Sequence, residues 1–176
     1  MDHFEKKEIL NESMTQHGDY IKRLIFSYIK DSSKAEDIVQ DVFIKFYKNL
    51  DRFEGRSSIK TFLYRIAVNE CQNYLSSWHY RKLKITEKIK NLEYKSSVED
   101  DYIQKEQNVS LSDLIGKMPV KYREVIWLHY YVELTVPEIA DVLDCSVNTV
   151  KTRLLRGRKV LKIAIEESGG AYGYQK

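Results

Sequence analysis

The chain has 176 residues, of which 43% are hydrophobic and 31% are charged, and its formal net charge is +3. This length suits one ordinary domain or two small ones, and the composition is too apolar for wholesale disorder. No apolar run approaches the roughly 18–20 residues that a membrane-spanning helix needs. The N-terminus also lacks an apolar signal core. We therefore expect a cytoplasmic protein without direct membrane insertion.

Glycine, proline and cysteine usage indicates an all-α protein without a metal or disulfide framework. The chain has only 7 Gly and 2 Pro, with long periodic segments between them. Its 2 Cys, Cys71 and Cys145, lie far apart inside apolar helical patterns, and its 4 His are scattered. Because zinc sites and disulfides need paired ligands or thiols, we expect core packing for both cysteines and no metal or other cofactor.

The N-terminal part predicts three helices. The first runs from about Asp19 to Tyr28, and the second from Ala35 to Leu50, after a break in which Ser32 or Ser33 is a plausible N-cap. A short basic loop, residues 51–58, then leads into a third helix that extends to about residue 78. The second helix is acidic near its start and basic near its end, an order that also suits the helix dipole.

The predicted third helix has two distinct faces. Apolar residues at i, i+3/i+4 spacing predict its buried face: Ile59, Leu63, Ile66, Ala67, Cys71, Tyr74 and Trp78. A second stripe is mostly uncharged: Arg65, Asn69, Gln72, Asn73 and Ser76. Amide groups both donate and accept hydrogen bonds, so such a stripe can read base edges. Taken alone, it is better explained as a polar face in water.

Periodicity weakens between residues 81 and 110, which we interpret as a linker, and a second helical region begins near Leu111. Its most diagnostic stretch is TVPEIADVLDCSVNTVKTRLLRGRKVL. Thr135 and Glu138 predict a capping box, Asp144-Cys145 a turn, and Ser146 the N-cap of the next helix. Val147, Val150 and Leu154 would hold that helix to the domain. The pattern is typical of a helix-turn-helix, and a basic amphipathic helix pair of another purpose is the alternative.

Together these stretches resemble the extracytoplasmic-function sigma factors, the small two-domain specificity subunits of bacterial RNA polymerase. AEDIVQDVFIKFYKNLDRF is similar to their regions 2.1–2.2, and RSSIKTFLYRIAVNECQNYL to regions 2.3–2.4. LTVPEIADVLDCSVNTVKTRLLRGRKVLK is similar to region 4.2. The resemblance implies two small helical domains joined by a flexible linker. The expected boundaries are 14–82 for region 2, 83–110 for the linker, 111–166 for region 4 and 167–176 for a flexible tail.

The resemblance also implies which residues meet each partner. The residues that would dock on the clamp helices of the large polymerase subunit are Asp37, Gln40 and Asp41. The residues implied to recognise the minus-ten element are Arg52, Phe53, Arg56, Arg65, Asn69, Gln72 and Asn73, where the Phe53 loop captures a flipped base and drives melting. The residues implied to contact the minus-thirty-five element are Asn148, Thr149, Lys151, Thr152, Arg153 and Arg156. An anti-sigma factor, often membrane-bound, is the further partner that the family implies.

Two positions depart from the family pattern. Phe62 stands where many members have tryptophan, which keeps the apolar packing but removes an indole N–H. Asp144 precedes the turn cysteine where many helix-turn-helix proteins have glycine, and aspartate tolerates such turns.

Three functions compete at this point. The first is a promoter-specific sigma factor without catalytic activity. The second is a free-standing helix-turn-helix regulator whose N-terminal half serves dimerisation or ligand binding. It would not need the acidic patch at Asp37, Gln40 and Asp41. The third is an enzyme acting on nucleic acid, which is disfavoured because the sequence has no nucleophile arrangement and no phosphate-cradling glycine loop.

Overall fold

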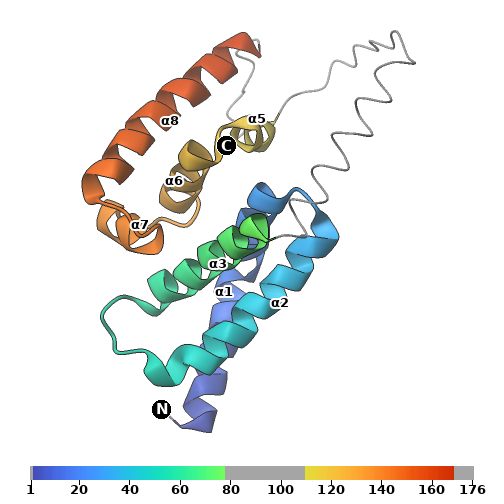
Figure 1. Cartoon of the computed structure of the whole chain (residues 1–176), viewed down its shortest axis with the longest axis vertical. Coiled ribbons are helices and arrows are strands. Elements are labelled where there is room, and N and C mark those ends of the chain that lie inside the picture. The colour runs from blue at the N-terminus through green and yellow to red at the C-terminus, as the bar shows by residue number, and fades with distance from the viewer. Residues whose placement is uncertain (1, 78–109, 169–176) are drawn as a thin grey trace. The chain divides into compact units, whose positions relative to one another are not determined.

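The structure, a computed structural model, describes residues 2–77 and 110–168, and within these ranges the chain is helical with short connections. The N-terminal helices are α1 (His3–Ile29), α2 (Ser32–Asn49) and α3 (Ile59–Ser76), with a short 3-10 helix, Leu50–Arg52, after α2 (Figure 1). The C-terminal helices are α5 (Leu111–Lys117), α6 (Val120–Tyr130), α7 (Val136–Val142) and α8 (Val147–Glu167). The all-α prediction is confirmed. The predicted linker and tail lie outside the described residues, apart from a few residues at their edges.

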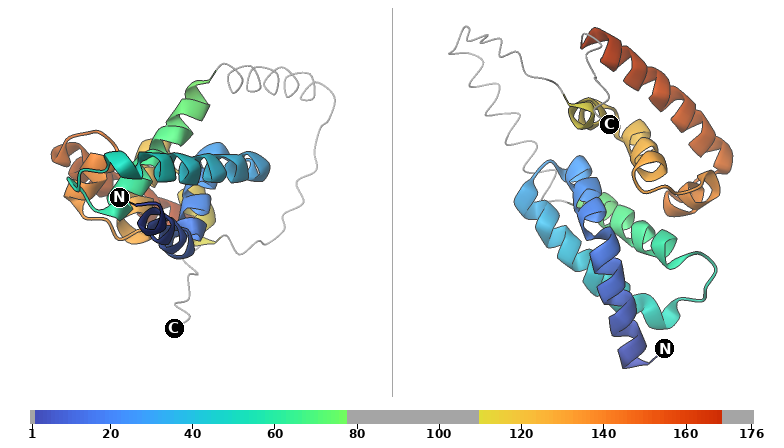
Figure 2. Two further views of the ribbon diagram at one scale, coloured as in Figure 1. Left: turned by 90° about the horizontal axis from the view of Figure 1, so that it is seen from below. Right: turned by 180° about the vertical axis from the view of Figure 1, so that it is seen from behind.

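α1 and α2 form an antiparallel helical hairpin that is visible from both sides (Figure 1, Figure 2). Lys30 ends α1 in the left-handed conformation, with φ of 61°. Asp31 then caps α2, because its side chain accepts a hydrogen bond of 3.0 Å from the backbone N–H of Lys34. The prediction that Ser32 or Ser33 caps this helix was therefore wrong by one residue. All three can serve as N-caps, and Asp31 also supplies a carboxylate at the positive end of the helix dipole.

α1 begins at His3, some four turns before the predicted start at Asp19. Its first turns are held by polar contacts rather than by the core. The His3 ring lies 2.7 Å from the Tyr47 hydroxyl, and Lys6 Nζ lies 2.6 Å from the Asp51 carboxylate. Phe4 in this segment is 70% exposed. Because the segment is held by polar contacts, its sequence shows no apolar periodicity.

The N-terminal helices share an apolar core, and its largest members each contribute about 1.5–3 kcal/mol by leaving water. Fully buried side chains are Ile21, Leu24, Ile25, Ala35, Val42, Phe46, Leu63, Tyr64, Ala67, Val68 and Cys71. On α3 the buried face differs from the prediction, because Tyr64, Val68 and Thr61 are buried, whereas Ile59, Ile66 and Tyr74 are only half-buried. The run FLYRIAV is apolar on several sides, so its spacing did not fix the orientation of the helix.

The C-terminal helices pack around α8, which contacts α5, α6 and α7. Fully or nearly fully buried side chains here are Ile115, Val125, Ile126, Leu128, Ile139, Val142, Val150 and Leu154. Gly157 allows α8 to approach α6 closely, because a Cβ atom there would lie 3.2 Å from Ile126 Cγ1 and 3.4 Å from Tyr122 Cβ. Val147, predicted to hold α8 to the domain, is instead 38% exposed.

The predicted helix-turn-helix is present. Thr135 and Glu138 form a capping box at the start of α7, with the Thr135 backbone N–H donating to the Glu138 carboxylate at 2.8 Å. Asp144 adopts φ of 47° in the turn, the region in which glycine or aspartate is favoured over most residues. Ser146 caps α8 by accepting a hydrogen bond from the Thr149 N–H at 3.1 Å, as predicted.

Candidate nucleic-acid and polymerase interfaces

The acidic residues predicted to meet the polymerase share one exposed face of α2. Asp37, Gln40 and Asp41 are all exposed, at i, i+3 and i+4 spacing. Asp37 already has a partner, since its carboxylate lies 3.0 Å from Lys34 Nζ. Ile44, one turn further along the same face, is 49% exposed and adds an apolar contact that the sequence analysis missed. An acidic face with one exposed aliphatic side chain suits a basic protein surface.

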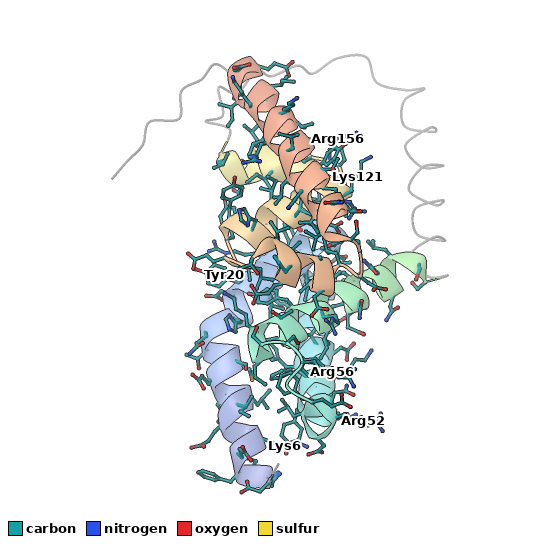
Figure 3. The ribbon with its side chains drawn as sticks, turned by 90° about the vertical axis from the view of Figure 1, so that its left-hand side faces the viewer. Lys6, Tyr20, Arg52, Arg56, Lys121 and Arg156 are labelled. Atoms are coloured by element: carbon teal, nitrogen blue, oxygen red, sulfur yellow. The ribbon has the colours of Figure 1, made fainter. Side chains whose placement is uncertain are left out.

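The loop between α2 and α3 carries two of the predicted minus-ten residues on its surface (Figure 3). Arg52 is exposed, and Arg56, whose side chain is 85% exposed, forms an ion pair of 2.5 Å with Glu54. Phe53 is half-buried, with its ring 5.1 Å from the ring of Phe62. Phe62 therefore performs the apolar packing expected of the aromatic residue at its position.

The polar stripe of α3 is mostly exposed. Asn69, Gln72 and Asn73 are exposed side chains on one side of the helix. Arg65 differs from them, because it is half-buried and forms an ion pair with the Asp141 carboxylate. Its Nε also donates to the Asp141 backbone carbonyl at 3.0 Å. The stripe therefore presents amides to solvent, while its one cation is already bonded.

The outward face of α8 is basic and polar. Asn148, Lys151, Thr152 and Arg156 are exposed, and Figure 3 shows Arg156 on the outer side of the helix. Thr149 is half-buried, with its hydroxyl 2.8 Å from the Ser146 hydroxyl. Exposed cations and hydroxyls on a helix that follows a tight turn are the features by which such helices bind in a DNA major groove.

Other residues of α8 are also exposed but were not among the predicted minus-thirty-five contacts. Leu155 is 52% exposed beside these polar residues, and an exposed aliphatic side chain can contact a thymine methyl group. Arg158 and Lys159 are also exposed, toward the C-terminal part of the helix. An apolar residue on a predicted reading face is easily assigned to the core by periodicity alone, which explains why Leu155 was overlooked.

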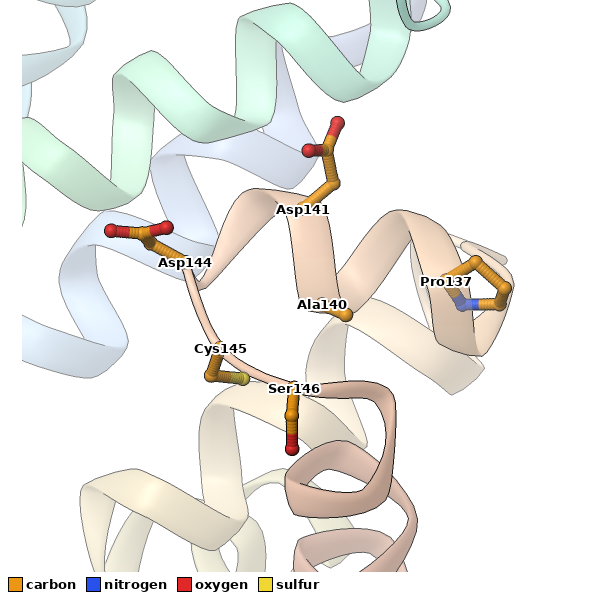
Figure 4. A pocket seen from close by; sticks show the side chains of 6 residues that line it. All are labelled: Pro137, Ala140, Asp141, Asp144, Cys145 and Ser146. Atoms are coloured by element: carbon orange, nitrogen blue, oxygen red, sulfur yellow. The ribbon is translucent and has the colours of Figure 1, made fainter.

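The turn side of the helix-turn-helix is hollowed and acidic (Figure 4). Asp144, Cys145 and Ser146 follow one another along the turn, and the Asp141 carboxylate projects from α7 nearby (Figure 4). The hollow is lined by Pro137, Ala140, Asp141, Asp144, Cys145 and Ser146. Carboxylates repel phosphates, so this side of the motif is a poor surface for nucleic acid, in contrast to the basic face of α8.

Arg153, predicted to contact DNA, has a protein partner. Its Nη1 lies 2.8 Å from Glu124 Oε1 on α6, and the Glu124 side chain is only 9% exposed. The other oxygen of this carboxylate accepts a hydrogen bond of 2.7 Å from the Tyr28 hydroxyl. Burial raises the pKa of Glu124, while the Tyr28 hydrogen bond and the Arg153 charge oppose that shift.

The two cysteines carry no sign of reactivity or metal binding. Both are free thiols, and burial raises the pKa of Cys71 to about 12. Desolvation also raises the pKa of Cys145. In the ranges 2–77 and 110–168, no group of His, Cys, Asp and Glu side chains could hold a metal ion. Likewise, no helix within these ranges is long and apolar enough to span a membrane.

Comparison with known proteins gives matches in both halves of the chain. The sigma-70 region 2 family model matches residues 14–79, and the sigma-70 region 4 model matches residues 108–161. The chain is 36% identical over 160 residues to the ECF RNA polymerase sigma factor SigW of Bacillus subtilis, covering 83% of each protein. It is 31% identical over 164 residues to the ECF RNA polymerase sigma-E factor of Escherichia coli K12, covering 88% of this chain and 85% of that protein.

Two solved structures share the fold. CnrH, in complex with the cytosolic domain of CnrY, matches with a TM-score of 0.63 and 24% identity over 90% of this chain and 88% of that one. The sigma factor RpoE of Bartonella quintana, in complex with the anti-sigma factor NepR, matches with a TM-score of 0.61 and 22% identity. That match covers 89% of this chain and 96% of RpoE. At these identities the likeness concerns the fold.

Proposed function

Since the chain belongs to the extracytoplasmic-function (ECF) family of RNA polymerase sigma factors, we propose that it binds core RNA polymerase and directs initiation at its own set of promoters. Members of this family are transcription initiation factors, not enzymes. The observation that carries the proposal is the presence, in one chain, of an exposed acidic face on α2 and an exposed basic face on α8. A protein that joins a polymerase to DNA needs both.

The acidic face is proposed to bind the clamp helices of the large polymerase subunit. Asp37, Gln40 and Asp41 supply hydrogen-bond acceptors and charge, and Ile44 supplies an apolar contact at its edge. Electrostatic complementarity of this kind mainly accelerates association and fixes orientation. The ion pair between Asp37 and Lys34 is exposed, so Asp37 can exchange Lys34 for a cation of the polymerase at little cost in free energy.

Promoter contacts are proposed for two helical surfaces. The minus-ten element would meet the loop residues Arg52, Phe53 and Arg56 and the α3 residues Arg65, Asn69, Gln72 and Asn73. Extruding a base costs a few kcal/mol, and an aromatic side chain with nearby amides can repay that cost by stacking and base-edge hydrogen bonds. The minus-thirty-five element would meet Asn148, Thr149, Lys151, Thr152 and Arg156 on α8. Arg153, expected with them, is left out of this proposal because it is paired with Glu124.

The proposed domain organisation follows these surfaces: region 2 at residues 14–82, a linker at 83–110, region 4 at 111–166 and a tail at 167–176. The family models match residues 14–79 and 108–161, which supports the placement of the two globular parts. We also propose a cytoplasmic location, where core polymerase is found, and regulation by an anti-sigma factor. One structural neighbour, RpoE with the anti-sigma factor NepR, is a complex of this kind, which supports the last point as an analogy.

The proposal is tested by adding the purified protein to bacterial core RNA polymerase and mapping transcription starts on genomic DNA. Discrete starts that share paired upstream motifs, and that core alone does not give, are expected. A free-standing regulator would instead bind DNA specifically without core and would not associate with it. That alternative is not favoured, because the relatives that match both halves of the chain are sigma factors.

A matched pair of variants tests the acidic face separately. The double variant Asp37→Asn with Gln40→Ala should lose most of its affinity for core polymerase while keeping its helical circular dichroism signal. Glu36→Gln is the control, because Glu36 is also exposed on α2 but pairs with Lys22 at 2.7 Å. If the wild type, the double variant and Glu36→Gln all bind the polymerase equally, the acidic face is not part of the docking surface.

A further inference from the structure

The buried carboxylate of Glu124 is the most unusual charged group in the C-terminal helices. Glu124 is 7% exposed, and its two oxygens bond to separate donors, Arg153 at 2.8 Å and the Tyr28 hydroxyl at 2.7 Å. A carboxylate in such a place is costly unless it is paired and hydrogen-bonded. The proposed DNA contacts do not account for it.

Arg153 is the only residue of α8 that is ion-paired to another helix within the described ranges. The neighbouring cation on α6, Arg123, bonds elsewhere, since its Nη1 donates to the Gly116 carbonyl at 2.6 Å and to the Met118 carbonyl at 3.3 Å. The charge of Glu124 is therefore balanced chiefly through Arg153, which joins α6 to α8.

Helical spacing separates Arg153 from the outward face of α8. Val150, Leu154 and Gly157 are the buried positions of the helix, and residue 153 is adjacent to them at i+3, i−1 and i−4. Its side chain is 30% exposed, whereas Lys151, Thr152 and Arg156 are all exposed residues. The guanidinium thus lies at the edge of the contact between α6 and α8.

We propose that Glu124 is a positioning residue for minus-thirty-five recognition: its carboxylate fixes α8 on α6 through Arg153, and Arg153 itself does not read a base. This inference rests on the proposed function, because it assigns how the recognition helix is held. Small displacements of a recognition helix weaken all of its base contacts together, since these contacts depend on precise placement in the groove. The pair of Glu124 and Arg153 therefore determines how strongly α8 discriminates between DNA sequences, and the outward residues determine which sequence it prefers.

The first test uses holoenzyme assembled from the full chain and core polymerase, with a duplex DNA library randomised over the upstream element as the probe. Glu124→Gln keeps the size and the acceptor for Tyr28 but removes the charge. It should lower discrimination at all positions of the selected motif by at least about tenfold in total, the scale of a lost charge-assisted hydrogen bond. Its salt dependence should be at least as steep as that of the wild type, because no phosphate contact is removed and Arg153 loses its carboxylate partner.

Arg153→Lys separates positioning from base reading. Lysine keeps a cation beside Glu124, so a positioning role predicts discrimination close to that of the wild type. A base-reading arginine binds through its planar fork, which lysine cannot replace, so a reading role predicts lost preference at one base pair. Arg156→Lys is the matched control, because Arg156 is exposed on the outward face.

Combining the substitutions gives a further check. Glu124→Gln with Arg153→Gln should discriminate no worse than the poorer single variant, because both changes break one interaction. Arg153→Gln alone leaves the buried carboxylate without a cation and can fail to fold. The Glu124→Gln and Arg153→Lys proteins leave no such charge and decide the question in that case. The proposal is overturned if Arg153→Lys changes a single base preference while Glu124→Gln selects the wild-type motif with wild-type sharpness.

A second measurement does not depend on DNA. Amide hydrogen exchange of the isolated chain should be several-fold faster across the first turns of α8 in Glu124→Gln, and unchanged there in Arg156→Lys. If exchange in α8 is the same in Glu124→Gln as in the wild type, Glu124 does not hold the helix and the inference fails. If the wild-type holoenzyme selects no motif at all, the proposed function fails, and hydrogen exchange still tests the positioning role.

Discussion

The two helices proposed to meet DNA, α3 and α8, differ in the state of their cations. On α8 the side chains of Lys151 and Arg156 are exposed, whereas on α3 Arg65 is bonded to Asp141 through both its Nε and its terminal nitrogen. Exposed cations attract phosphates over distances of about a Debye length, while a paired cation must first exchange its partner. If both helices meet DNA as proposed, α8 offers exposed cations to the phosphates, whereas the polar stripe of α3 offers mainly amides.

The helices also differ in how they are held. α3 is anchored by a continuous apolar face that includes Leu63, Ala67 and Val68, all fully buried. α8 relies on a close approach at Gly157 and on a buried ion pair with Glu124. Apolar contacts are non-directional, whereas a close approach at glycine and an ion pair each depend on exact placement of the two helices. α8, the helix with the more exposed reading face, is therefore the one held by contacts with the stricter geometry.

The largest expected effect is on the attachment of α3. Leu63→Ala should lower the free energy of unfolding by about 2–5 kcal/mol, because Leu63 is 0% exposed and its truncation leaves a cavity. Leu155→Ala, on the outward face of α8, should change it by no more than about 0.5 kcal/mol. Urea unfolding of both variants measures the difference, and equal losses would contradict the view that only Leu63 is structural.

The close approach of α8 to α6 is tested at Gly157. Gly157→Val should lower the free energy of unfolding by about 1–3 kcal/mol, because its branched side chain would overlap Ile126 and Tyr122. Gly18 is the control, since no atom lies within 4 Å of its Cβ position inside α1. Gly18→Ala should raise stability by about 0.5–1 kcal/mol through helix propensity. A neutral Gly157→Val would show that the two helices can separate at no cost.

The start of the helix-turn-helix should be sensitive to acid. Hydrogen bonds from the Thr135 side chain and backbone hold the pKa of Glu138 below its usual value of 4.5. Because the folded-state pKa is depressed, the stabilisation is present above the unfolded-state pKa and is lost as pH falls through the folded-state pKa. Thr135→Ala should cost about 0.5–2 kcal/mol at neutral pH.

Thermal unfolding over a pH series checks this prediction. We expect the stability of the wild type to decline below about pH 4.5, and Glu138→Gln should flatten that decline. Glu133→Gln, which removes an exposed carboxylate before the helix-turn-helix, serves for comparison. An unchanged profile in Glu138→Gln would mean that other carboxylates govern acid unfolding.

The smallest expected effect concerns the paired cation of α3. Asp141→Asn should change stability by only about 0–1 kcal/mol, because the ion pair with Arg65 is partly exposed. It should also steepen the salt dependence of single-stranded DNA binding by about one charge, as Arg65 becomes available to phosphate. Asp144→Asn makes the same change in net charge on the turn. If both variants bind DNA alike, the effect is one of overall charge and not of Arg65.

Much of the fold could be predicted because the determining interactions are local. Thr135 and Glu138 are three residues apart, so their capping box is visible in the sequence, and the αL conformation of Asp144 follows from turn chemistry. The first half of α1 was missed because its contacts, such as that between Lys6 and Asp51, are polar and distant in sequence. Such contacts leave no periodic pattern of apolar residues in the sequence.

The sequence predicted which residues make up the candidate site, but not which of them are bonded to residues of other helices. Helical spacing placed Asp37, Gln40 and Asp41 on one exposed face, as the structure has them. It also placed Arg153 among the outward residues, because spacing alone cannot show that a carboxylate 29 positions away bonds to it. Pairing of charges between helices depends on tertiary packing, and it decides which cations remain exposed to a ligand.

The contrast between the two cysteines has a practical consequence. Cys71 is 0% exposed within the N-terminal helices, and its high pKa leaves almost no thiolate at neutral pH. Cys145 is only half-buried, in the turn between α7 and α8. A thiol reagent should therefore label Cys145 through small local openings but reach Cys71 only when the N-terminal core unfolds. The labelling rates of these two native thiols would report separately how often each half of the protein opens, without any engineered probe.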